Sequence, residues 1–395
     1  MITTEIIIAA FMFILILTSG ALQAQQGTDE GKQAAQDDDS DPLFVINENG
    51  KWGFIDQTGK MVIEPEFDDA ISPLEGGLIM PFSEGLAPVG VNDKWGYIDK
   101  KGDIKIAPQF DEACPFSEGL AKVRIGDRQT GKWGYIDKTG KVVIPPQFYY
   151  PCDFSEGLAA VRIADRYTGK WGYSKCGYID KTGNVVIALQ FDGASDFSEG
   201  LAAVTIGDFN TGKVGYIDKT GQFVINLQYS DAWPFSDGLA AVSVGDAETG
   251  KWGYIDKMGK MVIEPQFDEA GPFSEGLANV CIGEFRISDL RAGKAETPKW
   301  GFIDKTGRTV IELQYAFACG FYEGLANVMP FREGGMLGVS SGYIDRTGKL
   351  VIDFQPYDGG PFTHGLAMAV TVEGLEPGTV GYIDKTGKYV WGPIG

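Results

Sequence analysis

Nine aspartates recur along the chain, each at the end of a Gly-Tyr/Phe-Ile-Asp or closely similar sequence. They are Asp56, Asp99, Asp137, Asp180, Asp218, Asp256, Asp304, Asp345 and Asp384. Two carboxylates held a few ångströms apart can hydrolyse a glycosidic bond. An active site needs one asymmetric arrangement, however, whereas nine identical aspartates fit a role that every copy shares. We therefore predict that these carboxylates serve the fold.

The chain has one histidine, His364, at a place where other copies have Glu or Asp in a Phe-Ser-Glu-Gly sequence. This placement favours a loop substitution over a general base. Nothing resembles a Ser-His-Asp arrangement, a P-loop or a dinucleotide-binding fingerprint. The sequence thus predicts no catalytic residue, no cofactor-binding residue and no cofactor, and a protein that is not an enzyme. A hydrolase with a concealed site is the least favoured alternative.

The five cysteines are an odd number: Cys114, Cys152, Cys176, Cys281 and Cys319. Three of them occupy one repeat position, where other copies have Ser195, Trp233 or Gly271. A position that accepts such different residues is neither part of a metal-ligand set nor an obligatory disulfide partner. We predict small, partly buried thiols and no metal site.

A sequence unit recurs from about residue 43 to the C-terminus. Its glycine marker falls at Gly53, Gly96, Gly134, Gly177, Gly215, Gly253, Gly301, Gly342 and Gly381. Successive markers lie 38 to 48 residues apart, which is strong evidence for a repeat architecture. We count about nine copies, the last of them partial.

The third copy, GKWGYIDKTGKVVIPPQF, shows how a unit is built. Trp133 to Asp137 and Val142 to Ile144 are rich in aromatic and β-branched residues, so we predict two strands. Asp137 to Gly140 matches a type I turn, which makes these strands a hairpin. Pro145 and Pro146 are expected to end the second strand or place it at a sheet edge. A following Gln-Phe-Asp segment is a candidate for a short fourth strand.

The Phe-Ser-Glu-Gly sequence predicts a tight loop closed by glycine. After it, Leu120 to Ile125 alternates apolar and charged residues, which predicts a half-buried strand with Lys122 and Arg124 on its exposed face. In the Trp-Gly pair, Trp supplies apolar area and Gly lets a neighbouring backbone approach. The unit is therefore three antiparallel strands with a possible fourth.

These units resemble the WG-repeat family of bacterial proteins, through stretches such as KWGYIDKTGKVVIPPQF and FSEGLAAV. The resemblance covers residues 43–395 and implies all-β repeat modules that mediate interactions, without a common enzymatic activity. We expect an all-β tandem array of antiparallel β-meander units arranged as propeller-like blades. An open β-solenoid or superhelical array is the alternative.

Three regions are expected. Residues 1–24 are predicted to be a cleaved signal peptide, because Ile6 to Leu17 is an apolar run too short to span a bilayer comfortably. Residues 25–42 read as a disordered acidic linker. Residues 43–395 form the repeat domain. The protein is then exported to the periplasm, the cell surface or the medium, without membrane insertion after cleavage. Anchoring by an uncleaved N-terminal segment is the alternative.

The formal charge of −20 argues against nucleic acid as a partner. We expect a non-catalytic scaffold of the cell envelope that binds protein partners across a β surface. A carbohydrate or cell-wall binding module is the alternative, and exposed Trp and Tyr rings would favour it. Specificity is expected where copies disagree, in the loops at residues 71–80, 174–176, 283–298 and 329–340.

Overall fold

A computed structural model describes residues 41–72, 78–79, 81–163, 175–208, 211–246, 249–283, 298–331, 340–373 and 376–394. The predicted signal peptide and nearly all of the predicted linker lie outside these residues. Strands are the regular elements throughout the described ranges. Nowhere in them is there a helix long and apolar enough to cross a membrane.

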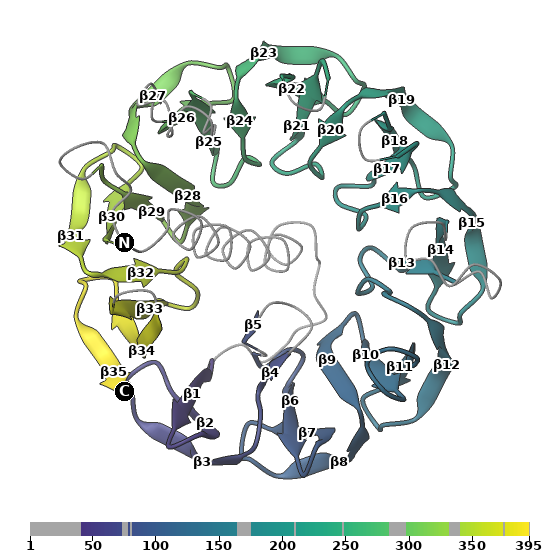
Figure 1. Ribbon diagram of the computed structural model, residues 1–395, viewed down its shortest axis with the longest axis vertical. Coiled ribbons are helices and arrows are strands. Elements are labelled where there is room, and N and C mark those ends of the chain that lie inside the picture. Colours follow the sequence, from purple (N-terminus) through teal and green to yellow (C-terminus); the bar gives the residue numbers. More distant parts are fainter. Residues whose placement is uncertain are drawn as a thin grey trace, which may run out of the picture. The chain divides into compact units, whose positions relative to one another are not determined.

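The chain divides into two compact units. Unit 1 comprises Met1–Val204 and Asp218–Gln222, and unit 2 comprises Thr205–Ile217 and Phe223–Gly395. In the described residues the strands form nine antiparallel sheets of three or four strands, which we call blades 1 to 9, and one two-stranded sheet. Figure 1 labels the strands in chain order. The all-β fold of propeller-type blades predicted from the sequence is confirmed.

Blades 1 to 4 lie in unit 1. Blade 1 is β1-β2-β3 (Phe44–Glu48, Lys51–Ile55, Met61–Phe67), and blade 2 is β6-β7-β8 (Leu86–Val91, Lys94–Asp99, Ile104–Phe110). Blade 3 is β9 to β12 (Glu112–Ser117, Leu120–Ile125, Lys132–Asp137, Val142–Phe148), and blade 4 is β13-β14-β15 (Leu158–Arg162, Cys176–Asp180, Val185–Phe191). The small sheet pairs β4 with β5 (Ile71–Ser72, Leu78–Ile79).

Blade 5, in which the boundary between the units falls, is β16 to β19 (Gly193–Ala194, Ala202–Ile206, Lys213–Ile217, Phe223–Tyr229). In unit 2, blade 6 is β20 to β23 (Asp231–Ala232, Leu239–Val244, Lys251–Asp256, Met261–Phe267). Blade 7 is β24 to β27 (Glu269–Ala270, Leu277–Ile282, Lys299–Asp304, Thr309–Tyr315). Blade 8 is β28 to β31 (Phe317–Tyr322, Leu325–Met329, Ser341–Asp345, Leu350–Gln355), and blade 9 is β32 to β35 (Tyr357–Gly359, Leu366–Glu373, Glu376–Asp384, Tyr389–Ile394).

The blades begin at a different point of the repeat from the one read in the sequence. A full blade starts with the residues before Phe-Ser-Glu-Gly and ends with the strand that follows the Asp-Lys-Thr-Gly turn. The last Trp-Gly-type hairpin, β34 and β35, therefore completes a four-stranded sheet, whereas blade 1 has three strands. We number the strands of every blade by the four-stranded pattern, so that the hairpin always contains the third and fourth strands.

The prolines do not end the fourth strand, as the sequence suggested they could. β12 runs through Pro145 and Pro146 to Phe148. Tyr135 pairs with Ile144 and Trp133 pairs with Phe148, so two extra residues of β12 form a bulge opposite Gly134. Proline is tolerated there because β12 is an edge strand with no further neighbour to bond. The predicted short fourth strand of Gln-Phe-Asp is instead the end of this strand.

The bulge explains the Trp-Gly pair. A Cβ placed on Gly134 would lie 2.4 Å from the carbonyl oxygen of Ile144 and 2.7 Å from the nitrogen of Pro146. The marker glycines of the other blades face equivalent contacts, most of them from the backbone of their own fourth strand. Glycine is thus required by the close approach of the fourth strand, as the sequence predicted.

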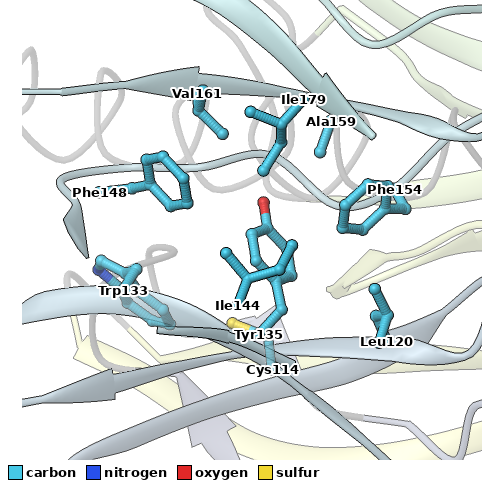
Figure 2. Packing of buried hydrophobic residues seen from close by; sticks show 10 residues of the cluster. All are labelled: Cys114, Leu120, Trp133, Tyr135, Ile144, Phe148, Phe154, Ala159, Val161 and Ile179. Carbon is cyan, nitrogen blue, oxygen red and sulfur yellow. The ribbon is translucent and has the colours of Figure 1, made fainter. Parts of the chain in front are cut away.

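Within each unit, the aromatic face of one blade packs on the next blade. In Figure 2, Trp133, Tyr135 and Phe148 of blade 3 lie against Ala159 and Ile179 of blade 4. The same pairing of a Trp/Tyr face with an Ala-Val-Ile face recurs between blades 2 and 3, 6 and 7, and 7 and 8. The two blades of each of these pairs therefore share a hydrophobic core.

This packing overturns the prediction of a half-buried second strand. Lys122 and Arg124 were placed on an exposed face, but only 9% and 7% of their surfaces are exposed. Their side chains share the aromatic face with Trp133 and Tyr135, which the next blade covers. Ile125, predicted to lie on the buried face, is 48% exposed because the strand ends there.

Candidate functional site

The recurring aspartates hold the hairpin turns. Oδ1 of Asp137 accepts hydrogen bonds from the backbone N–H and hydroxyl of Thr139 at 2.9 and 2.6 Å, and from the N–H of Lys141. The N–H of Gly140, which has a φ of 82°, bonds to the carbonyl of Asp137. These hydrogen bonds, that of the Thr139 hydroxyl foremost, lower the pKa of Asp137. The carboxylates serve turns, as the sequence predicted.

The recurring tyrosines of the third strand are tied into the core. The hydroxyl of Tyr135 donates to the carbonyl of Cys152 at 2.7 Å, and that of Tyr254 donates to the carbonyl of Gly271 at 2.8 Å. Burial raises the pKa of Tyr135 well above its ordinary value. Further rings bonded in this way belong to Tyr97, Tyr178, Tyr216 and Tyr343. None of these six rings is exposed as a stacking platform.

The tryptophan rings also belong to the core. Trp95, Trp133 and Trp300 are buried, with 5 to 8% of their surfaces exposed. Trp52 and Trp252 are half-buried and pack against the clusters of their blades. Open aromatic platforms, which a carbohydrate-binding module would need, are thus not formed by these residues.

Within each unit, the glutamate of a Phe-Ser-Glu-Gly turn links its blade to the next. Glu118 of blade 3 accepts a hydrogen bond from the N–H of Gly157 at 2.9 Å and an ion pair from Lys181 at 3.2 Å, both in blade 4. Ser117 adds a bond from its hydroxyl to the carbonyl of Phe154 at 2.8 Å. We call this set the clasp. The glutamate adopts a positive φ of 54° in it.

Clasps recur inside both units. Glu84 is bonded by Gly119 and Lys138 in unit 1, and Glu323 by Gly365 and Lys385 in unit 2. The sequence showed the loop but not this function, because the partners lie 35 to 63 residues apart along the chain. His364 occupies the glutamate position of blade 9 with a φ of 50°, so it is a turn residue.

Removing a clasp should cost stability. We expect Glu118→Ala to lower the free energy of unfolding by about 1–2 kcal/mol, because the N–H of Gly157 loses its acceptor and Lys181 its partner. Urea denaturation measures this loss. Glu264→Ala, on the exposed side of a fourth strand, is the control and should change stability by less than about 0.5 kcal/mol. Equal effects of the two substitutions would contradict the role of the clasp.

All five cysteines are free, and they are buried or half-buried. Burial raises the pKa of Cys319 to about 12, and that of Cys281, where Glu269 contributes, to about 12. Such thiols are poor nucleophiles. Within the described part of the chain, no group of three or more His, Cys, Asp or Glu side chains could hold a metal ion.

The connections between second and third strands vary most in length. They span two residues in blades 1 and 2, but residues 283–298 in blade 7 and 330–340 in blade 8. Most residues of the loops predicted to carry specificity lie outside the described residues. The described residues at the ends of five second strands share one feature, which is exposure of an aliphatic side chain. Five aliphatic side chains there are 40 to 52% exposed: Ile125, Ile163, Ile206, Val244 and Ile282.

The sequence pattern does not distinguish these aliphatic residues from buried ones. The alternating pattern places them on a buried face, and only their position beside a variable connection marks them as different. Within unit 2, Ile206, Val244 and Ile282 belong to three consecutive blades, so this unit presents a repeated apolar element beside its variable connections. Single exposed aliphatic residues need no explanation. Here the same repeat position is exposed in three consecutive blades, beside connections of the kind that often carry binding residues.

Comparison with known proteins identifies the family. The description "WG containing repeat" matches residues 52–95, 95–128, 133–171, 177–208, 215–246, 252–284, 300–337 and 342–371. The chain therefore belongs to the WG-repeat family. No curated protein matches it.

Solved structures resemble the chain in fold. The crystal structure of a eukaryotic initiation factor matches with a TM-score of 0.59 and 13% identity, over 88% of this chain and 95% of that one. The β-propeller domain of the Trilobed protease from Pyrococcus furiosus matches with a TM-score of 0.41 and 12% identity, over 71% and 97%. At these identities the first likeness concerns the fold alone, and the second is too weak to support an argument.

Proposed function

We propose that the protein is a non-catalytic interaction scaffold that is exported to the cell envelope and binds protein partners. The observation that carries this proposal is the exposed aliphatic element beside the variable connections, described above for Ile206, Val244 and Ile282. The motif residues are already committed to turns, clasps and core, so they serve the frame. Export is supported by the apolar run from Ile6 to Leu17 and its small following residues.

The proposed surface combines a rigid support with variable edges. Each exposed aliphatic residue stands at the end of a strand that is hydrogen-bonded on both sides in its blade. Apolar side chains on such a support can be buried by a partner without loss of backbone freedom. The length differences among the connections would then let different blades contact different parts of a partner.

The triple substitution Ile206→Ser, Val244→Ser and Ile282→Ser tests this surface. We expect it to abolish the saturable capture of envelope proteins by the purified repeat protein. The matched control is Val224→Ser, Val262→Ser and Val351→Ser, which removes valines of similar exposure from fourth strands of the same unit. Unchanged capture by the first triple, or equal loss in both, would contradict the proposal. For export, the chain recovered from the envelope should begin near residue 22 or 25.

A further inference from the structure

Blade 3 contains a buried ion pair between its first two strands. Glu112 of β9 lies directly opposite Arg124 of β10, and Nε of Arg124 donates to Oε2 of Glu112 at 3.0 Å. Nη1 of Arg124 also donates to the carbonyl of Gly126 at 2.6 Å. The side chains of Glu112 and Arg124 are 0% and 9% exposed. At this repeat position the fold therefore accommodates a guanidinium against a carboxylate.

Among the described residues of unit 2, three blades have the carboxylate at this position without a cation opposite it. Three carboxylates, in blades 6, 7 and 9, lie at the start of the first strand. Asp231 and Glu269 are the first residues of β20 and β24, and Asp358 is the second residue of β32. The residues opposite them are Ser243, Cys281 and Val370, where blade 3 has Arg124. None of the three carboxylates forms an ion pair with another described residue.

The first two strands of these blades contain no alternative cation. Neither lysine nor arginine occurs in the first two strands of blades 6 to 9, which lie within residues 231–244, 269–282, 317–329 and 357–373. Burial raises the pKa of Asp231, Glu269 and Asp358, and for Asp358 the value is about 6. Water still reaches all three, because Asp231 and Glu269 are exposed and Asp358 is half-buried. Each is thus an accessible negative charge in crowded surroundings.

The strand that carries Asp358 also contains an unsatisfied group, which points to the opposite face of β32 from the Asp358 carboxylate. Tyr357, the preceding residue of β32, is 2% exposed, and its hydroxyl has no hydrogen-bond partner among the described residues. A buried hydroxyl without a partner costs free energy, as does an ionised carboxylate without a cation. The cost of the ionised carboxylate falls when a ligand that carries a positive charge and hydrogen-bond donors binds beside it.

We propose that Asp231, Glu269 and Asp358 form a binding surface for basic side chains of a protein partner, each accepting an arginine or lysine as Glu112 accepts Arg124. This inference rests on the proposed scaffold function and specifies the chemistry of the partner. Arginine fits best, because its planar guanidinium already fills the equivalent place in blade 3. The net negative charge of the chain would add long-range attraction for such a partner.

A fluorescein-labelled peptide of six Arg-Ser repeats serves as the probe, with fluorescence anisotropy in physiological salt at pH 7.5. We expect saturable binding that weakens at least tenfold in the triple variant Asp231→Asn, Glu269→Gln and Asp358→Asn. The matched control, Glu264→Gln, Glu312→Gln and Asp353→Asn, removes three exposed acids from fourth strands of unit 2 and should weaken binding less than twofold. This control shows whether weaker binding comes from the loss of the three specific carboxylates or from the change in net charge.

Equal losses in the two triple variants, or no saturable binding to the native chain, would overturn the inference. Val370→Arg provides a second test, because it places a guanidinium opposite Asp358 as Arg124 stands opposite Glu112. It should weaken probe binding, and an unchanged affinity would count against the surface. Capture of envelope proteins that persists when the probe fails to bind would refute this surface alone and leave the scaffold function standing.

Discussion

Gly134→Ala is expected to lower the free energy of unfolding by at least about 3 kcal/mol. The new methyl carbon would lie 2.4 Å from the carbonyl oxygen of Ile144, where no relaxed Cβ can remain. The obstacle is backbone rather than the end of a flexible side chain, so the bulge of β12 would have to move. That movement would also disturb Trp133 and Phe148, which pair across the bulge and pack on blade 4.

Urea denaturation followed by tryptophan fluorescence measures this loss. The control is Gly320→Ala, whose added carbon would meet its nearest neighbours at 3.6 Å and beyond, in ordinary van der Waals contact. The control should cost less than about 1 kcal/mol. If Gly134→Ala proved as mild as Gly320→Ala, the close approach of the fourth strand would not be the reason for the Trp-Gly pair.

Much of a single blade could be predicted from the sequence because its contacts are local. The turn from Asp137 to Gly140 depends on residues two to four apart, and the partner strands of the hairpin follow at once. The requirement for Gly134 was predictable for a similar reason. Its obstacle, Ile144, lies ten residues further on in the same hairpin.

The phase of the blades could not be predicted, for a reason inherent in tandem repeats. A repeated pattern is identical whether a unit is taken to begin at Trp-Gly or at Phe-Ser-Glu-Gly. The choice depends on which strands exchange hydrogen bonds, and β9 pairs with β10 across the Phe-Ser-Glu-Gly turn. The neighbouring blade also covers both charged residues of β10, a burial that an isolated strand pattern cannot reveal.

Neither the clasp nor the candidate binding surface could be predicted from the sequence, because both depend on relations between copies of the repeat. Glu118 and Gly157 lie 39 residues apart, so the clasp becomes visible only when consecutive blades are packed. The carboxylates of Asp231, Glu269 and Asp358 stand out only when the strand registers of different blades are compared. Arg124 lies opposite Glu112, whereas Val370 lies opposite Asp358. In the sequence, Asp358 is one acid among many.

Asp358 should make the protein less stable at neutral than at mildly acidic pH. Burial raises the pKa of its carboxyl from 3.8 to about 6, so the folded state binds the proton more tightly than the unfolded state. The stability that the protonated carboxyl of Asp358 contributes is fully present below about pH 4. It falls as the pH rises to about 6 and does not change further above that pH. A difference of about two pKa units corresponds to about 3 kcal/mol lost at pH 7.5.

The groups near Asp358 do not offset this loss. Cys319, Tyr343 and Tyr357 lie close enough to interact with it or with its neighbours, and none of them is cationic. Asp358→Asn should therefore raise the free energy of unfolding by about 3 kcal/mol at pH 7.5, and the gain should shrink toward zero near pH 4. Asp353→Asn on the exposed fourth strand should change stability by less than about 0.5 kcal/mol at both values. Urea denaturation at the two pH values distinguishes these outcomes, and a gain for Asp358→Asn that is the same at pH 4 and pH 7.5 would show that the carboxylate is not the source of the strain.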